Sequence, residues 1–471
     1  MPLKTLHLTN SWHETSGGIA TFYRALIDEA NKRNCEIRLV VPGAADGVEG
    51  AGRFGKIYYI QAPPALFNPN YRMIYPSQFL LAESKLQKIV SMERPDLVEI
   101  CDKYTLNYFG ALLRMRLASQ LNFRPLVLGL SCERMDDNFR SYIGRVPLWR
   151  RFCSWYVKWA YFPFFDHHIA NSSYTAGELQ AATRGHVVPR GIWIRPMGVD
   201  LSCLTPQRRS PEQRCALMQT MGASANSILL LYAGRLAPEK NLPLLFSLMK
   251  LLACDSKHDF RLLVAGDGIE RERWERECAQ RLPRRVTFVG HIRDRNRLAD
   301  LYANSDFFIH PNPREPFGIA PLEAMASGLP LIAPNTGGVT SYANAENAWT
   351  VEPNPQDFAA AIAQALTDHR TRQRKIICAV NQAQEYGWSK VAASFFDLYT
   401  ELYNAAQHKQ AVRLPPAFTS TPPTVLQKAM IDFVSQAAQW ALEIVASLSR
   451  RTTAPQGRAE ARELQQSVRD G

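Results

Sequence analysis

The chain has 471 residues, of which 46% are hydrophobic and 21% charged, and its formal net charge is +12. This length is too great for one core and predicts two domains with additions, and no window approaches the ~20 continuous apolar residues that a membrane span requires. The positive charge fits phosphorylated substrates or an anionic membrane surface, whereas the dispersed basic residues and the lack of a nucleic-acid-binding motif argue against nucleic acid.

The cysteines and the N-terminus indicate the cellular compartment. Nine cysteines are scattered along the chain without a C-x-x-C pair. They are typical of reduced thiols, not of a disulfide framework or a zinc site. The first residues, MPLKTLHLTNSW, begin a strand almost at once and lack the order of a secretory signal. We therefore expect a cytoplasmic protein.

Strand-like segments alternate with helical patterns from residue 3 to about residue 400, which predicts parallel sheets covered on both faces. In the first half the expected strands are KTLHLTNS, CEIRLVVPG, DLVEICD, RPLVLGLSC and DHHIANSS. Ser16, Gly17 and Gly18 lie between the first of these and a predicted helix over residues 19–32. Glycines there let backbone N–H groups approach a phosphate or a sugar. An ordinary strand-to-helix turn is the alternative.

Residues 147–165, PLWRRFCSWYVKWAYFPFF, combine aromatic and basic side chains. The aromatic stripe at helical spacing consists of Trp149, Phe152, Tyr156 and Trp159, and the cations beside it are Arg150, Arg151 and Lys158. Such a helix can lie at a lipid interface, where aromatic rings take the headgroup level and cations meet anionic lipid. A helix packed on the sheet of its own domain is the alternative, and the sequence favours neither.

The second half restarts the strand series with SILLLYAGR, after a Pro- and Arg-rich segment over residues 195–214 that we interpret as the interdomain connection. Arg235 and Lys240 follow this strand and open a helix. Two such cations suit a diphosphate, because cleavage of a bond to a diphosphate leaves negative charge that a metal or protein cations must neutralise. We find no Asp-x-Asp at a strand end for Mg²⁺, so these two cations could replace the metal. A solvated helix start, with Arg235 near Glu239, is the alternative.

Residues 310–338, HPNPREPFGIAPLEAMASGLPLIAPNTGG, are the most informative stretch. Glu315 and Glu323 lie eight positions apart with Pro-Phe-Gly between them. The turn brings backbone N–H groups to one spot, and a helix over residues 319–327 points its positive end at the same spot. A carboxylate at each end of such a turn can hold the hydroxyls of a sugar and of a ribose. Surface charges flanking a loop are the alternative, but they leave the Pro-Phe-Gly unexplained.

Together these motifs resemble the retaining glycosyltransferases of family 4, which have the GT-B fold. The resemblance covers about residues 5–405 and includes Glu-x7-Glu, Gly-Arg-Leu-x-x-Glu-Lys and the PMGVD of residues 196–200. It implies an α/β protein with two facing doubly wound Rossmann-like domains and the active site in the cleft. We expect an acceptor-side domain over residues 1–200, a nucleotide-sugar domain over 201–385 and a helix over 386–410 that returns to the first domain.

The resemblance also implies the catalytic residues. Arg235 and Lys240 would clamp the donor diphosphate and stabilise the leaving group. Gly17 and Gly18 would lie against the same diphosphate. Glu315 would orient the donor sugar.

The remaining donor contacts implied by the resemblance surround the sugar, the ribose and the base. Glu323 would accept hydrogen bonds from the ribose hydroxyls. The backbone N–H groups of Phe317, Gly318 and Ile319 would lie near the sugar, and Ile292 would pack beside the nucleobase.

The chain departs from the family at the end of one strand of the first domain. Members commonly carry a histidine where this sequence reads GLSCERMDD, so Cys132 stands in the histidine position. A thiol cannot supply the same hydrogen bond to the sugar. Either Glu133, Arg134 or Asp137 compensates, or the acceptor is positioned differently.

We therefore expect a metal-independent retaining transferase that moves a mannosyl or glucosyl group from a GDP- or UDP-sugar to a saccharide or lipid-linked acceptor hydroxyl, without a further cofactor. Its pathway would be glycolipid or polysaccharide synthesis. Two other classes stay open. A GT-B sugar-nucleotide epimerase would need a carboxylate acid/base set facing its substrate. A non-catalytic membrane-associated scaffold would not need the arginine, the lysine and the two glutamates.

Residues 411–471 depart from the enzyme core. LPPAFTSTPP is a linker by composition, and Thr424 with Gln427 makes a capping-box pattern before apolar residues recur at helical spacing as far as Leu448. The last twenty or so residues are polar and predicted to be disordered. This helix and residues 147–165 suggest reversible docking on an anionic inner-membrane face, with packing against protein as the alternative.

Overall fold

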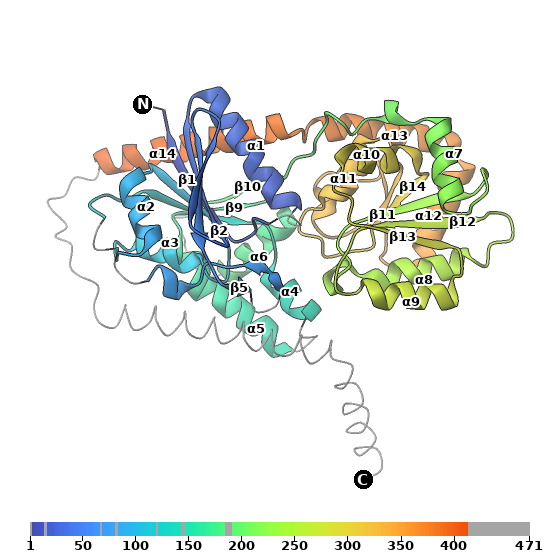
Figure 1. Cartoon of the computed structure of the whole chain (residues 1–471), viewed down its shortest axis with the longest axis horizontal. Coiled ribbons are helices and arrows are strands. Elements are labelled where there is room, and N and C mark those ends of the chain that lie inside the picture. Colours follow the sequence, from blue (N-terminus) through green and yellow to red (C-terminus); the bar gives the residue numbers. More distant parts are fainter. Residues whose placement is uncertain are drawn as a thin grey trace, which may run out of the picture. The chain divides into compact units, whose positions relative to one another are not determined.

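The computed structural model describes residues 2–13, 17–65, 68–80, 83–118, 121–142, 147–183 and 191–412. It divides into two compact units, each an α/β structure (Figure 1). The first unit comprises the described residues up to 170, residues 176–183 and 191–193, and residues 393–412. The second comprises residues 171–175 and 194–392.

The first unit is built on an eight-stranded sheet with the order β10-β9-β8-β7-β1-β2-β4-β3. Its strands are β1 (Lys4–Thr9), β2 (Glu36–Gly43), β3 (Gly47–Ala51), β4 (Gly55–Gln61), β7 (Leu97–Cys101), β8 (Leu126–Ser131), β9 (His167–Ala170) and β10 (Ile192–Ile194). β1 pairs in parallel with β2 on one side and with β7 on the other, whereas β3 pairs antiparallel with β4. The strand order therefore reverses at β1, as in doubly wound domains.

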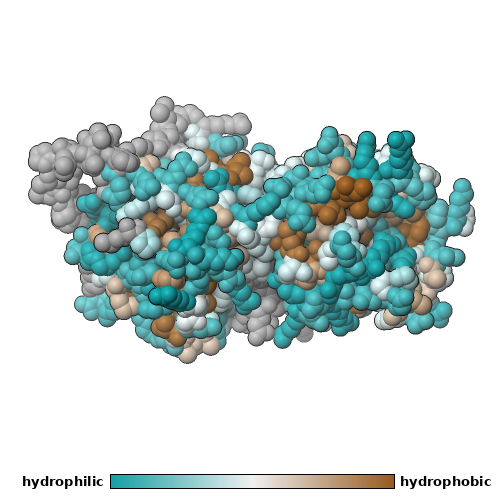
Figure 2. All heavy atoms as spheres, turned by 90° about the horizontal axis from the view of Figure 1, so that it is seen from above, coloured by the Kyte–Doolittle hydropathy of each residue, from teal (hydrophilic) through white to brown (hydrophobic). Residues whose placement is uncertain are grey.

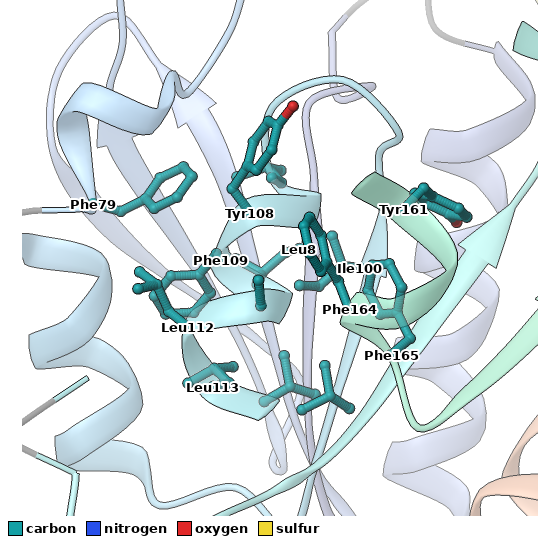
Figure 3. Close-up of a cluster of buried hydrophobic side chains, with 14 of the residues drawn as sticks. Leu8, Phe79, Ile100, Tyr108, Phe109, Leu112, Leu113, Tyr161, Phe164 and Phe165 are labelled. Atoms are coloured by element: carbon teal, nitrogen blue, oxygen red, sulfur yellow. The ribbon is translucent and has the colours of Figure 1, made fainter. Parts of the chain in front are cut away.

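Helices cover this sheet, and apolar side chains join the two layers. The helices are α1 (Gly17–Arg33), α2 (Lys85–Glu93), α3 (Asn107–Arg114), α4 (Met135–Tyr142), α5 (Pro147–Tyr156) and α6 (Ser173–Thr183). Figure 3 shows Leu8 and Ile100 of the sheet among Phe109 of α3 and the rings of Phe164 and Phe165. All five side chains are buried, which is the contact that fixes α3 and the 161–165 segment on the sheet.

The second unit contains a six-stranded sheet with the order β13-β12-β11-β14-β15-β16. The strands are β11 (Ile228–Ala233), β12 (Phe260–Ala265), β13 (Val286–Gly290), β14 (Phe307–Ile309), β15 (Leu331–Pro334) and β16 (Trp349–Val351), and the paired neighbours run parallel. The helices are α7 (Pro211–Thr220), α8 (Leu242–Leu252), α9 (Arg271–Arg281), α10 (Arg295–Asn304), α11 (Ile319–Ala326), α12 (Pro355–Thr367) and α13 (His369–Gln384). β11 and β14 are neighbours in the middle of the sheet, and all their residues except Ala233 are buried. Because the two strands are parallel, the loops that follow them lie at the same edge of the sheet.

α14 (Trp388–Val412) begins in the second unit and continues in the first. In the second unit, Trp388 packs so closely on Gly198 that a Cβ at Gly198 would lie 2.4 Å from the indole. In the first unit, Phe395 packs on Phe22 with ring centroids 4.9 Å apart, and the Tyr399 hydroxyl donates to Glu99. The aromatic spacing of this helix thus supplies packing contacts in each unit in turn.

The strands predicted from apolar runs all exist, whereas the short strand pairs were not anticipated. β3 has the sequence GVEGA, is exposed and carries no apolar alternation, so nothing local marks it as a strand. The two-stranded pair β5 (Pro64–Ala65) and β6 (Asn68–Arg72) has no apolar alternation in its sequence either. Residues 195–214, interpreted as the interdomain connection, lie in the second unit, where Arg208 bonds Asp300 at 2.9 Å. The predicted tail helix lies outside the described residues.

The surface of both units is mostly hydrophilic on the face that Figure 2 shows, with hydrophobic residues in separate groups. Among the described residues, no helix is both long enough and apolar enough to cross a membrane.

Candidate functional site

Lys240 and Glu315 form the centre of the candidate site. Lys240 ends a short 3-10 turn between β11 and α8, and Glu315 lies in the loop between β14 and α11. The ammonium of Lys240 donates to both carboxylate oxygens of Glu315, at 2.8 and 2.9 Å, and the Asn312 amide donates to Glu315 at 3.0 Å. Burial raises the pKa of Glu315, but Lys240 and the hydrogen bonds outweigh it and lower the pKa to about 2. Glu315 is therefore ionised at neutral pH.

Arg235 lies on the same loop as Lys240, just after β11, but its side chain is 54% exposed. Its Nε lies 3.4 Å from Glu239, the neighbour named in the alternative interpretation of this motif. The carbonyl oxygen of Arg235 accepts a hydrogen bond from the buried Tyr232 hydroxyl at 2.9 Å. The backbone of Arg235 is thus held while its guanidinium stays in contact with solvent.

The turn after Glu315 is supported by the glycines that follow β15. The Gly338 amide donates to the Glu315 carbonyl at 2.6 Å, and a Cβ at Gly338 would lie 1.9 Å from the Pro316 carbonyl oxygen. Gly318 has φ of +89° and precedes α11, so the chain turns sharply there. The amides of Gly318 and Ile319 lie at the start of the helix, where N–H groups have no acceptor within the helix. Figure 1 shows α11 beside the strands of its sheet.

Glu323 lies in α11 and bonds a residue that the sequence did not single out. The Tyr302 hydroxyl of α10 donates to Glu323 at 2.8 Å. Burial raises the pKa of Glu323, and the bond from Tyr302 opposes that rise. Tyr302 is fully buried, so it holds the carboxylate in one orientation.

His310 is a further residue of this region that sequence reasoning missed. It directly follows β14, is 6% exposed, and its Nε2 atom has no hydrogen-bond partner among the described residues. Burial and the charge of Lys240 lower the pKa of His310 to about 4, against the opposing effect of Glu315. The imidazole is therefore neutral at pH 7. A histidine directly after an apolar strand was the signal available in the sequence.

The other predicted residues lie at several places in the two units. Ile292 follows β13 at the same edge of the second sheet and is half-buried. Gly17 and Gly18 open α1 in the first unit, and Ser16 lies outside the described residues. His13 precedes them and stacks on Tyr71 with ring centroids 3.7 Å apart. Among the described residues no group of three or more His, Cys, Asp or Glu side chains could hold a metal ion.

This arrangement can bind an anion and a polyol at one sheet edge. Arg235 and the amides at the start of α11 can face phosphate oxygens. The ammonium of Lys240 has three N–H groups and donates two of them to Glu315, which leaves one for a ligand. The ionised Glu315 can accept from hydroxyls, and so can the carboxyl oxygens of Glu323.

Two family models match the chain in sequence order. Residues 16–213 match Glycosyltransferase Family 4, and residues 216–379 match Glycosyl transferases group 1. The chain belongs to the family 4 glycosyltransferases. It is an enzyme that transfers a sugar, which favours the transferase over the epimerase and over the non-catalytic scaffold.

Individual relatives agree with the family. The transferase is 28% identical over 396 residues to the GDP-mannose-dependent alpha-(1-6)-phosphatidylinositol dimannoside mannosyltransferase of Mycobacterium tuberculosis, covering 83% of this chain and 94% of the relative. It is 30% identical over 249 residues to D-inositol 3-phosphate glycosyltransferase 2 of Catenulispora acidiphila, covering 50% of this chain and 56% of the relative.

The fold agrees as well. Sucrose-phosphate synthase of Thermosynechococcus elongatus superimposes with a TM-score of 0.67 at 20% identity, over 86% of this chain and 100% of that one. The predicted GT-B fold is therefore confirmed.

Proposed function

We propose that the enzyme transfers a hexosyl group, mannose or glucose, from a nucleotide-diphosphate sugar to a hydroxyl of a glycolipid or inositol-containing acceptor, with retention at the anomeric carbon. The observation that carries the proposal is the Lys240–Glu315 pair beside Arg235 at the ends of β11 and β14. The relative that uses GDP-mannose and acts on a phosphatidylinositol dimannoside supports this donor and acceptor class.

In the proposed reaction the leaving group is stabilised by fixed positive charge. The bond between the anomeric carbon and the phosphate oxygen breaks, and its electron pair stays on the diphosphate. Arg235 contributes a guanidinium suited to two phosphate oxygens, and Lys240 contributes its remaining N–H. Because Lys240 is held by Glu315 before substrate binds, its charge needs little reorganisation in the transition state.

Glu315 is proposed to orient the donor sugar, not to attack it. Its two oxygens already accept three hydrogen bonds from Lys240 and Asn312, and its low pKa makes it a weak nucleophile. A carboxylate held in this way can still accept from sugar hydroxyls through its remaining lone pairs. Retention would then follow a same-face substitution in which the leaving diphosphate helps to deprotonate the acceptor. Glu323, oriented by Tyr302, is proposed to bind the ribose hydroxyls.

A donor panel tests the proposal. Hydrolysis and transfer are measured with GDP-mannose, UDP-glucose and ADP-glucose, with phosphatidylinositol dimannoside and inositol 3-phosphate as acceptors, and the product's anomeric configuration is read by NMR. We expect turnover of one donor and an α-linked product. A β-linked product would overturn retention, and no turnover of any donor would overturn the transfer reaction.

We also propose that the enzyme docks on an anionic membrane face through α5 and the turn that follows it, although Trp159 alone of the stripe predicted from the sequence is exposed. Trp149 and Phe152 pack against the core of the first unit, and Tyr156 is buried. Leu148, Trp155 and Trp159 are instead 68%, 47% and 53% exposed. Leu148 and Trp155 are seven positions apart and share one face of α5, and Trp159 follows in the π-helical turn Val157–Tyr161.

Cations accompany this exposed face. Arg150 and Arg151 are exposed, and the ammonium of Lys158 lies 5.2 Å from the ring centroid of Trp159. Exposed tryptophan with adjacent cations is complementary to anionic headgroups over an apolar layer. A lipid-linked acceptor would be presented at such a surface.

Vesicle flotation tests the docking proposal. Replacement of both Trp155 and Trp159 by alanine should reduce binding to phosphatidylglycerol vesicles at low salt, while Met92→Ala, which removes an apolar side chain 64% exposed on α2, should not. Equal binding to neutral vesicles would contradict the proposal. A chain truncated after Val412 tests separately whether the last 59 residues contribute.

A further inference from the structure

A second group of polar residues lies at the carboxyl edge of the first sheet. Asp102 and Lys103 directly follow β7, and Glu133 follows β8 after one intervening residue. In open α/β sheets, ligands bind outside the carboxyl ends of the strands. A transferase needs a site for its second substrate, and this edge is a candidate for it.

The cations at this edge are already paired. Lys103 is 1% exposed and forms an ion pair with Glu178, which also accepts from the Met135 amide at 2.7 Å. Arg134 pairs with Asp136 at 2.7 Å and with Asp137 at 3.4 Å. These carboxylates therefore have partners that satisfy their charge.

Asp102 is satisfied in another way. Its Oδ1 atom accepts from the amides of Tyr104, Thr105 and Leu106 at 2.9, 2.6 and 2.9 Å, and Asn10 donates to its Oδ2 atom at 3.2 Å. These bonds hold the turn that leads into α3, so Asp102 serves the fold.

Glu133 differs from its neighbours, because it has no ion-pair partner among the described residues. Its Oε2 atom accepts from the Asn138 amide at 2.9 Å, and its carbonyl oxygen accepts from Lys103 and from the Ser131 hydroxyl. The backbone and one carboxylate oxygen are thus fixed, while the structure shows no donor to Oε1 among those residues. Burial raises the pKa of Glu133, and Lys103 and Asn138 only partly oppose the rise. A carboxylate with a raised pKa is a stronger hydrogen-bond acceptor for a hydroxyl.

A buried hydroxyl nearby has no partner either. Tyr161 is completely buried, the Lys103 ammonium lies 5.7 Å from its ring centroid, and its hydroxyl has no hydrogen-bond partner among the described residues. Burial raises its pKa, and Cys101, Glu178 and Cys132 add to the rise, which locates the ring beside the same strand ends. An unsatisfied buried hydroxyl is uncommon and is a second sign that a ligand or water completes this edge.

Cys132, which stands in the family's histidine position, is engaged elsewhere. Its thiol shares a hydrogen bond with the thiol of Cys101 at the end of β7. Of the three residues that could compensate for the histidine, Arg134 and Asp137 are paired with each other. Glu133, by contrast, has no ion-pair partner among the described residues, and its carboxylate accepts from Asn138 through Oε2.

We infer that Glu133 binds a hydroxyl of the acceptor and positions it for transfer. The inference rests on the proposed function. The ligand class is a neutral polyol, such as a hexose or an inositol ring, since a carboxylate at this place would repel a phosphate. Asn138 holds Glu133 in the orientation required.

Steady-state kinetics of Glu133→Gln test the inference. With phosphatidylinositol dimannoside in mixed vesicles as acceptor, KM for the acceptor should rise roughly 10- to 100-fold, the effect of losing a charged hydrogen-bond partner. KM for the donor and the rate of donor hydrolysis should stay within about twofold. The rise of acceptor kcat/KM with pH that follows ionisation of Glu133 should disappear in the variant.

Matched variants keep the test decisive. Asp137→Asn changes a carboxylate in the first turn of α4, four positions from Glu133, and should leave the acceptor KM unaltered. Glu133→Asp retains the charge, but its shorter side chain moves the carboxylate away from the acceptor. It should raise the acceptor KM even if Glu133→Gln folds poorly. Binding of methyl α-mannoside in the presence of GDP, followed by saturation-transfer NMR, provides a readout without turnover.

The outcomes separate the two proposals. A parent enzyme that turns over no donor refutes the proposed function. A parent that transfers sugar or binds methyl α-mannoside, with Glu133 variants that match it, refutes the role of Glu133 alone. A parent that hydrolyses donor but neither uses nor binds either acceptor probe also overturns this assignment.

Discussion

Lys240 and Glu315, which are 75 positions apart in the sequence, form an ion pair in which one ammonium bonds both oxygens of one carboxylate. Their side chains are only 21% and 12% exposed. When an ion pair is largely removed from water, deleting one partner destabilises the folded protein much more than replacing both partners does. The cation proposed for the phosphate and the anion proposed for the sugar therefore depend on each other.

Lys240→Met should destabilise the enzyme by about 3 kcal/mol, since it leaves a buried carboxylate unpaired. The double variant Lys240→Met/Glu315→Gln should recover most of that stability but no activity. Urea unfolding of the parent, both single variants and the double variant measures the coupling. Additive free energies of unfolding would contradict the dependence of the two residues on each other.

If the guanidinium stabilises the leaving diphosphate, Arg235→Ala should lower kcat/KM roughly 100-fold, which corresponds to a loss of about 3 kcal/mol of transition-state stabilisation. Because the side chain is 54% exposed, the free energy of unfolding should change by no more than about 0.5 kcal/mol. Arg273→Ala is the matched control, since Arg273 is 55% exposed and pairs with Glu270 at 3.2 Å in the same unit. A similar rate for all three proteins would remove Arg235 from the site.

Glu323→Gln should weaken donor binding by about 1.5–3 kcal/mol, because the ribose would lose bonds to a charged acceptor. Tyr302→Phe should produce a smaller loss, since it only releases the carboxylate from its orientation. Isothermal titration with GDP and with UDP measures both variants against the parent. If Glu323→Gln binds the nucleotide as tightly as the parent does, the ribose contact is excluded. Glu315→Gln should instead reduce kcat with the correct sugar.

Stability should fall as the pH drops from about 6.5 towards 4 because of His310. Its pKa in the folded protein is lowered to about 4, whereas an unfolded histidine titrates near 6.5. Below pH ~6.5 the unfolded state binds a proton that the folded state does not. The free energy of unfolding therefore falls with pH, and by pH ~4 it has decreased by about 3 kcal/mol. Urea unfolding at several pH values should show a smaller decline for His310→Gln, and parallel curves would contradict the assignment.

Turnover should persist in EDTA, because protein cations are proposed to neutralise the leaving group. The assay compares initial rates with EDTA and with added Mg²⁺ for parent and Arg235→Ala. Activity that disappears in EDTA and returns with Mg²⁺ would show that a metal carries this charge.

The sequence by itself determined the elements and their order. Apolar runs such as SILLLYAGR and FRLLVAGDG mark buried strands, and the helix after Gly318 is marked by the turn before it, because these signals are local. The loops that carry Arg235, Lys240 and Glu315 could be assigned for the same reason, and the family follows from their order.

Only the tertiary structure decided which of these groups meet. The bond from Lys240 to Glu315, the bond from Tyr302 to Glu323 and the burial of His310 depend on how loops from separate strands converge at one sheet edge. Likewise, helical spacing predicted an aromatic face on α5 but not that Trp149 would pack inward while Trp155 stays exposed. Periodicity reports that a helix has an apolar side, whereas its orientation depends on long-range packing against the rest of the core.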